Sequence, residues 1–363
     1  MSQYTLYGAD VSYYTGKARA YLRWRGVPFE EVLATGEVYK NFILPNVGWP
    51  VIPVMKSPGG DIIQDTADII AYVEQSIDAA PSAYPEGEVQ KFVAELIHLY
   101  ADEWLVLPAM HYRWNYNEDW TYGEFGRMSA PHLTPEEQYQ LGAKNGQRFK
   151  GALPPLGVSD ATIPGIESSY ESLLDELSAH FEKYDFIMGN RATLADFAMI
   201  GPMYAHLWRD PKSRELMESR APKVADWVKR VHEGEGKTGD LPENDAIPDT
   251  LLPILARQMR EQIPALIATI GQFQTWLERA DDTSKLPRGF GEITVSIEGH
   301  AGPAQSRSFP LFRLQGALDA YEALSDEGKA RANAMLREIS GSEFTGLKLP
   351  RRLARREYRL ALA

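Results

Sequence analysis

The sequence predicts an α/β domain, an all-helical domain after it and a mostly helical C-terminal extension. Strand and helix patterns alternate in the first part of the chain, whereas from 89 to 110 apolar residues recur at helical spacing. The glycine-rich break at 234–242 precedes a last segment with helical periodicity and one strand-like run. We therefore expect domains at 1–84 and 88–235 and an extension at 240–363.

The first domain follows a β–α–β order and then a β–β–α order, which produces a small mixed sheet with helices packed on it. Pro81 to Gly87 has the composition of a linker to the next domain. The expected elements are a strand at 4–7, a helix at 15–25, a strand at 29–33, a helix at 37–45, a hairpin of strands at 51–55 and 61–63, and a helix at 66–78.

The remaining elements are predominantly helical. The segment 111–165 is rich in aromatic residues, Gly and Pro, and we expect a long insertion with some helix there. The arginines of 351–359 form either a solvated helix face or an interdomain contact. The other expected elements are helices at 89–110, 166–181, 194–208, 222–232, 248–279 and 311–339, and a strand at 290–299.

Composition narrows the functional classes. The 363 residues carry a net charge of −12, which disfavours binding to nucleic acid or to an anionic membrane surface. No cysteine is present, so disulfides, thiolate metal sites and a cysteine nucleophile are excluded. The seven histidines lack metal-ligand spacing, and we expect no metal. Residues 1–4 lead into a strand rather than a signal peptide, and no apolar run is long enough to span a bilayer, so we expect a cytoplasmic protein.

The most informative local feature is the run Val51-Ile52-Pro53-Val54. A proline inside an apolar strand cannot donate to a sheet ladder, and a cis Ile52–Pro53 bond at a strand start explains it. A helix then begins at Asp65-Thr66, and its start offers unpaired N–H groups and a positive dipole end to an anionic ligand. A tight turn followed by a capped helix is the structural alternative.

A second constellation lies where the first strand ends, at 8–19. Hydroxyl groups at the start of the following helix, from Ser12 and Thr15, can donate to a thiolate and lower its pKa. Lowering a thiol pKa from ~8.5 to ~6.5 needs about 2.7 kcal/mol, which a hydrogen bond and the helix dipole can supply. The alternative is that Ser12 or Thr15 only caps the helix. A third motif, Thr193 with Asp196, has the spacing of a capping box, which we interpret as structural.

Together these three motifs resemble the glutathione transferase superfamily, over about 1–110 and 160–235. The resemblance implies a thioredoxin-like N-terminal domain, an all-helical transferase domain, glutathione as co-substrate and a homodimer. Ser12 stands where tau-, theta- and omega-like members carry a serine that hydrogen-bonds the glutathione sulfur.

The resemblance also assigns binding residues. Ile52, next to Pro53, matches the residue whose backbone pairs with the cysteinyl part of glutathione, and Asp65 and Thr66 match the pair that binds its γ-glutamyl end. Two departures are present: Tyr13 replaces a common proline, and Thr66 replaces the usual serine. They favour a second reading, a non-catalytic protein that binds a ligand or a partner on the same fold.

Two questions stay open at this stage. Tyr7, Tyr14 and Thr15 are alternatives to Ser12 as the group that stabilises the thiolate. For the second substrate, a small hydrophobic molecule, the aromatic run after the first long helix is the candidate wall, although the same rings can equally form core or a subunit interface. The candidates for this wall are Trp104, His111, Tyr112 and Trp114.

Overall fold

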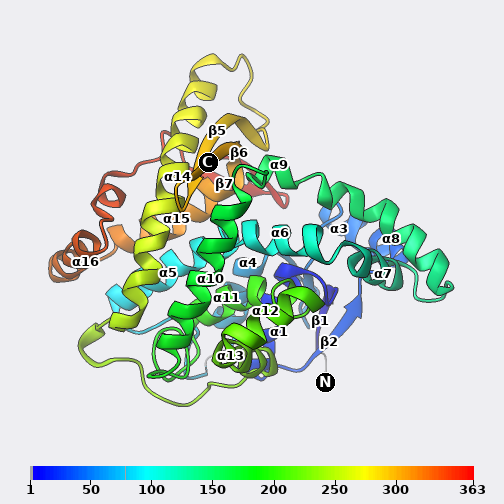
Figure 1. The fold of residues 1–363 in the computed structure, drawn as a ribbon, viewed down its shortest axis with the longest axis horizontal. Coiled ribbons are helices and arrows are strands. Elements are labelled where there is room, and N and C mark those ends of the chain that lie inside the picture. The colour runs from blue at the N-terminus through cyan, green and yellow to red at the C-terminus, as the bar shows by residue number, and fades with distance from the viewer. Residues whose placement is uncertain (1–2, 78) are drawn as a thin grey trace.

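The structure, a computed structural model, describes residues 3–77 and 79–363 (Figure 1). Its N-terminal part contains a four-stranded mixed sheet in the order β2-β1-β3-β4. The parallel pair is β1 (Tyr4–Gly8) with β2 (Phe29–Leu33). The antiparallel neighbours are β3 (Val54–Lys56) and β4 (Ile62–Gln64). The predicted mixed sheet is therefore confirmed.

Helices cover this sheet as the sequence predicts. α1 (Tyr13–Arg25) ends at Gly26, which takes a left-handed φ of 75° that glycine adopts without strain. Helix α4 (Thr66–Ser76) stops two residues before the predicted end, and residue 78 lies outside the described residues. The predicted helix at 37–45 is a succession of α2 (Gly36–Val38), a π-helical turn (Tyr39–Ile43) and α3 (Leu44–Val47).

The predicted insertion contains more helix than expected, because helices occupy most of it. Helices α7 and α8 form an antiparallel pair that projects from the body at the right of Figure 1. Glycines allow their backbones to touch, because a Cβ on Gly126 would lie 1.6 Å from the carbonyl oxygen of Gln138. The helices of this region are α6 (Val106–Tyr116), α7 (Glu118–Ser129), α8 (Pro135–Lys150) and α9 (Leu153–Leu156).

The core of the helical domain is α11 (Leu194–Ala205), in which every residue is buried. The predicted capping box at its start is confirmed, and Asp196 also accepts a hydrogen bond from Trp227 Nε1 at 3.0 Å. Burial raises the pKa of Asp196 to about 6, against the hydrogen bonds to its carboxylate. Around it lie α5 (Glu88–Glu103), α10 (Ile163–His180), α12 (Pro211–Arg220) and α13 (Pro222–Glu233).

The extension packs on α5 through three of its helices, α14, α15 and α16. It contains two β-hairpins where the sequence predicted one strand, and its basic tail is a hairpin, not a helix face. The missed strand, His300–Arg307, contains Pro303 and lacks an alternating apolar pattern. The elements are α14 (Leu252–Arg279), β5 (Gly289–Ile297), β6 (His300–Arg307), α15 (Ser308–Glu322), α16 (Asp326–Glu338), β7 (Leu353–Arg356) and β8 (Arg359–Leu362), with short 3₁₀ turns at Glu243–Asp245, Asp249–Leu251 and Ser342–Gly346.

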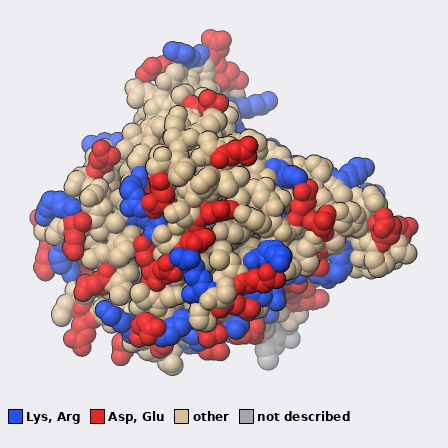
Figure 2. All heavy atoms as spheres, in the orientation of Figure 1, with Lys and Arg blue, Asp and Glu red and all other residues tan. Residues whose placement is uncertain are grey.

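Acidic and basic side chains are interspersed on the face drawn in Figure 2, and no single-sign patch dominates it. Within the described ranges, no helix has both the length and the apolar character needed to cross a bilayer.

Candidate active site

Three predicted segments meet at one edge of the N-terminal sheet. In the sheet register Tyr7 pairs with Val54, and Val54 pairs with Gln64. The loop after β1, the residues before β3 and the helix start after β4 are therefore adjacent. These are the segments from which the sequence predicts a thiol site.

Ser12 caps the first turn of α1 and is half-buried. Its Oγ accepts a hydrogen bond from the backbone N–H of Thr15 at 3.2 Å, so the predicted capping role is confirmed. Because this bond uses a lone pair, the O–H can still donate, and no described residue accepts it. A hydroxyl donor thus lies at the positive end of a helix, where an anion is stabilised.

The three alternative hydroxyls have other surroundings. The ring of Tyr7 stacks on Phe42 with centroids 3.9 Å apart. Tyr14 donates its proton to the carbonyl oxygen of Asp102 at 3.1 Å, and burial raises its pKa well above the ordinary value. Thr15 is fully buried. Tyr14 and Thr15 are therefore poorly placed, whereas Tyr7, like Ser12, is half-buried and donates its proton to no described residue. Of these two, Ser12 lies at the start of a helix, and its role stays a prediction.

The proline and the helix start have the predicted local structure. The Ile52–Pro53 bond is cis. Asp65 has a φ of 83°, a conformation unusual for a residue with a side chain, and it caps α4 by accepting the N–H of Ala67 at 2.9 Å. Thr66, the first residue of α4, is buried.

The C-terminal extension reaches this edge of the sheet. Arg355 Nη2 lies 3.0 Å from Asp65 Oδ2, and its Nη1 donates to Asp68 at 2.8 Å and to the carbonyl of Gln64 at 2.7 Å. Arg313 lies 3.7 Å from the other Asp65 oxygen. Burial alone would raise the pKa of Asp65, but Arg313 and Arg355 outweigh it and hold this pKa below its usual range. The interdomain contact expected of the basic tail is therefore confirmed.

A buried ion pair joins α1 to α5 beneath the site. Lys17 Nζ donates to both carboxylate oxygens of Asp102 at 2.8 Å, and their side chains are only 0% and 2% exposed. His98 Nε2 is 2.7 Å from the same Nζ and 3.1 Å from Asp102. Burial opposes ionisation of Asp102, but Lys17 and His98 outweigh it and keep its pKa well below the ordinary value.

Glu103, the next residue, is buried with its Oε2 3.2 Å from Arg307 of β6. Burial raises the pKa of Glu103 to about 7, with Arg307 opposing and Asp102 adding to the shift. Together with Trp104, Glu103 lines a cavity of ≈ 40 Å³ between α5, α14 and the β5–β6 hairpin. That volume has room for ordered water but not for an aromatic ligand.

Replacing Glu103 by Gln should change how stability depends on pH. Because folding raises the pKa of Glu103, the folded state binds more protons between about pH 4.5 and 7, and stability of the parent protein falls as pH rises through that window. The variant lacks this loss. The free energy of unfolding of the variant minus that of the parent protein should therefore increase from pH 5 to pH 8, by up to about 3 kcal/mol.

Urea unfolding at the two pH values measures this difference. Glu322→Gln is the matched control, since Glu322 is 71% exposed and its substitution should give the same difference at both pH values. An equally flat result for Glu103→Gln would contradict a raised pKa at that position.

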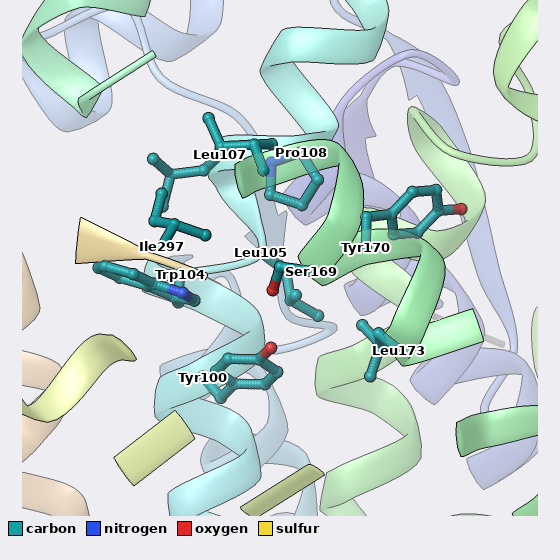
Figure 3. A pocket seen from close by; sticks show the side chains of 10 residues that line it. Tyr100, Trp104, Leu105, Leu107, Pro108, Ser169, Tyr170, Leu173 and Ile297 are labelled. Atoms are coloured by element: carbon teal, nitrogen blue, oxygen red, sulfur yellow. The ribbon is translucent and has the colours of Figure 1, made fainter. Parts of the chain in front are cut away.

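Of the predicted second-substrate residues, Trp104 lies beside cavities. Its Nε1 donates to Glu261 at 3.0 Å. It also lines a small pocket of ≈ 10 Å³, shown in Figure 3, with Tyr100 below it, Leu107 above it and Tyr170 on the opposite wall. This residue is placed at the junction of α5 with the extension.

The other three aromatic candidates contact the interior of the helical domain. His111 Nε2 lies 2.8 Å from a carboxylate oxygen of Glu167, and Tyr112 meets Tyr170 edge to face. Trp114 is 1% exposed. Their assignment to a substrate wall stays a prediction. No group of three or more His, Asp or Glu side chains in the described ranges is placed to hold a metal ion.

Comparisons with known proteins bear on the family. Residues 6–81 match the family described as "Glutathione S-transferase, N-terminal domain", and residues 160–230 match "Glutathione S-transferase, C-terminal domain". A search of curated proteins found no significant match.

Similar solved structures come from plants, fungi and bacteria. A tau class glutathione S-transferase from mango is 18% identical over 69% of this chain and 94% of its own, with a TM-score of 0.42. An enzyme of Ceriporiopsis subvermispora in complex with glutathione is 15% identical over 66% and 99%, with a TM-score of 0.45. One from Methylobacterium radiotolerans, in complex with glutathione sulfonate, is 18% identical over 68% and 99%, with a TM-score of 0.40.

At these identities the solved structures say nothing about the substrate. The two domain matches cover the mixed sheet and α10–α13, and they leave the extension unmatched. With a thioredoxin-like N-terminal domain and the helical domain of the same family following it, the chain belongs to the glutathione transferase superfamily.

Proposed function

We propose that the protein is a glutathione-dependent transferase that activates the glutathione thiol for attack on a hydrophobic or aromatic electrophile. The observation that carries this proposal is the free hydroxyl proton of Ser12 at the start of α1. A hydrogen bond from this group and the helix dipole both favour a thiolate over a thiol. The family to which both domains belong supports glutathione as the thiol compound.

The remaining contacts to glutathione follow from the family assignment. The backbone of Ile52 would pair with the cysteinyl part, and Asp65 and Thr66 would bind the γ-glutamyl end. A carboxylate at a helix start suits the ammonium of that group, and the free N–H groups suit its carboxylate. The same assignment makes a homodimer the expected assembly.

The chemistry needs few further groups. The thiolate forms a new bond from sulfur to an electrophilic carbon, and the electrophile either loses a leaving group or gains a proton. Positioning and thiolate stabilisation supply the rate enhancement, so addition, substitution, ether cleavage and isomerisation are all accessible. The electrophile would be seated near Trp104, where the ≈ 40 Å³ cavity would have to widen.

One observation favours the non-catalytic alternative. Asp65, the expected partner of the γ-glutamyl ammonium, is already paired with Arg355. A protein that uses the fold only to bind a ligand or a partner would tolerate such a pairing.

A pH titration of bound glutathione, followed by the ultraviolet absorbance of the thiolate, separates the two functions. We expect the bound thiol to ionise with a pKa about two units below the ~8.5 of a free thiol. S-methylglutathione is the control, because it binds without an ionisable sulfur. Absence of binding at millimolar concentrations, or an unshifted thiol pKa, would leave the non-catalytic function.

A further inference from the structure

The last two strands form a hairpin with two separate attachments. This C-terminal hairpin, residues 353–362, turns through Glu357 and Tyr358, whose φ values are 49° and 61°. Its base is held by α15, where Gln315 accepts the N–H of Leu353 at 2.6 Å and donates to its carbonyl at 3.0 Å. The base alone thus anchors the hairpin to α15. The tip, residues 355–359, can therefore contact another part of the molecule.

The tip rests on the edge of the sheet where the thiol site lies. The hydroxyl of Tyr358 donates to the carbonyl of Ile62 at 3.1 Å, and its ring packs on the small apolar cluster that Ile52 also contacts. Arg359 donates to the carbonyl of Gly48 at 3.0 Å. With Arg355 on Asp65, these contacts span the segment before the cis-proline and the start of α4.

We propose that the C-terminal hairpin is a built-in cover of the glutathione site, in which the guanidinium of Arg355 occupies the place of the γ-glutamyl ammonium. This inference rests on the proposed function. Asp65 uses Oδ1 to cap α4 and presents Oδ2 to Arg355. The guanidinium on Oδ2 takes the position that the γ-glutamyl ammonium would need, so the two cations compete for this oxygen.

The hairpin and the site carry opposite charges at their contact, and this contact is partly shielded from solvent. Arg355 and Asp65 are each 12% exposed, so their attraction is screened less than that of a surface pair. Asp68 accepts from the same guanidinium. When the tip leaves, two carboxylates are uncovered at the start of α4, while Arg313 of α15 stays beside Oδ1 of Asp65. A cationic ligand group is then favoured at the free Oδ2.

Glutathione binds only the molecules in which the tip is released. Its apparent affinity is therefore the intrinsic affinity multiplied by the fraction of open molecules. Glutathione binding must also release the tip, since both events involve the same oxygen atom of Asp65. The hairpin thus raises the concentration of glutathione needed to fill half of the sites.

Calorimetric titration of glutathione into full-length variants tests this inference. Arg355→Ala should bind glutathione about tenfold more tightly than the parent protein, because the open fraction rises. Arg356→Ala is the matched control: Arg356 is the next residue of the same hairpin, is exposed, and its side chain makes no hydrogen bond or ion pair with a described residue. It should bind like the parent protein.

Hydrogen–deuterium exchange supplies a readout independent of affinity and of folding in the variant. Saturating glutathione should accelerate exchange of the amides of residues 353–362 in the unmodified protein, while the amides of α11 stay protected. Tyr358→Phe, which loses only the hydrogen bond to Ile62, should shift affinity in the same direction by a smaller factor.

The outcomes separate the two proposals. If the parent protein binds glutathione but Arg355→Ala binds it no more tightly, or if hairpin exchange is unchanged at saturation, the cover is refuted and the proposed function stands. If neither the parent protein nor any of these variants binds glutathione, the proposed function fails, and the inference fails with it.

Discussion

Asp102→Asn is expected to lower the free energy of unfolding by about 3–5 kcal/mol, because it leaves the ammonium of Lys17 buried without an anion. His98, the other neighbour of that ammonium, carries no negative charge. Water cannot replace the lost carboxylate, since Lys17 is 0% exposed. Chemical unfolding followed by circular dichroism measures the loss.

A double variant, Lys17→Met with Asp102→Leu, is the control. Removing both charges at once avoids an unpaired buried ion, so the loss should be much smaller than for Asp102→Asn. Because the pKa of Asp102 is lowered in the folded state, its stabilising contribution is present above the ordinary value of ~3.9 and disappears as pH falls below it. Equal losses in the single and double variants would show that packing, not charge, decides stability here.

Ser12→Ala is expected to cut the thiolate fraction of bound glutathione at pH 7 by at most about 25-fold, the loss reached if the thiol pKa returns fully from ~6.5 to ~8.5. The dipole of α1 remains in the variant and makes the loss smaller than this limit. Glutathione affinity at pH 7 should weaken by no more than about fourfold, which is the change that linkage to the shifted thiol pKa requires. The measurement is the absorbance titration of bound thiol, paired with calorimetry for affinity.

Tyr7→Phe provides the comparison for that result. It removes the hydroxyl of Tyr7, which is one of the alternatives to Ser12. The pKa of the bound thiol should stay unchanged. A raised pKa in Tyr7→Phe, together with an unchanged pKa in Ser12→Ala, would transfer the role to Tyr7.

Local patterns in the sequence predicted the elements that are determined locally. The cis Ile52–Pro53 bond, the cap by Ser12, the helix start at Asp65 and the capping box of α11 each depend on a few neighbouring residues. Their motifs were therefore visible without a structure. Strand β6 was missed because a two-stranded hairpin tolerates Pro303 on its outer edge and needs no apolar alternation.

Contacts over long sequence distances were not predictable in the same way. Arg355 bonds to the carbonyl of Gln64 from 291 residues away, and no local pattern specifies that pairing. The basic tail suggested an interdomain contact without naming its target. Aromatic residues on α6 posed a different problem, because rings at helical spacing are equally compatible with a core and with a pocket wall.

The length of chain between Gln64 and Arg355 has a consequence during translation. At about 5–20 residues per second, roughly 15 to 60 s separate the synthesis of β4 from that of β7. A nascent chain on the ribosome thus exposes Asp65 to its surroundings well before its guanidinium partner exists. Newly made molecules should therefore meet cellular thiols while Asp65 is uncovered. The finished protein returns to that state only when the C-terminal hairpin dissociates from the site.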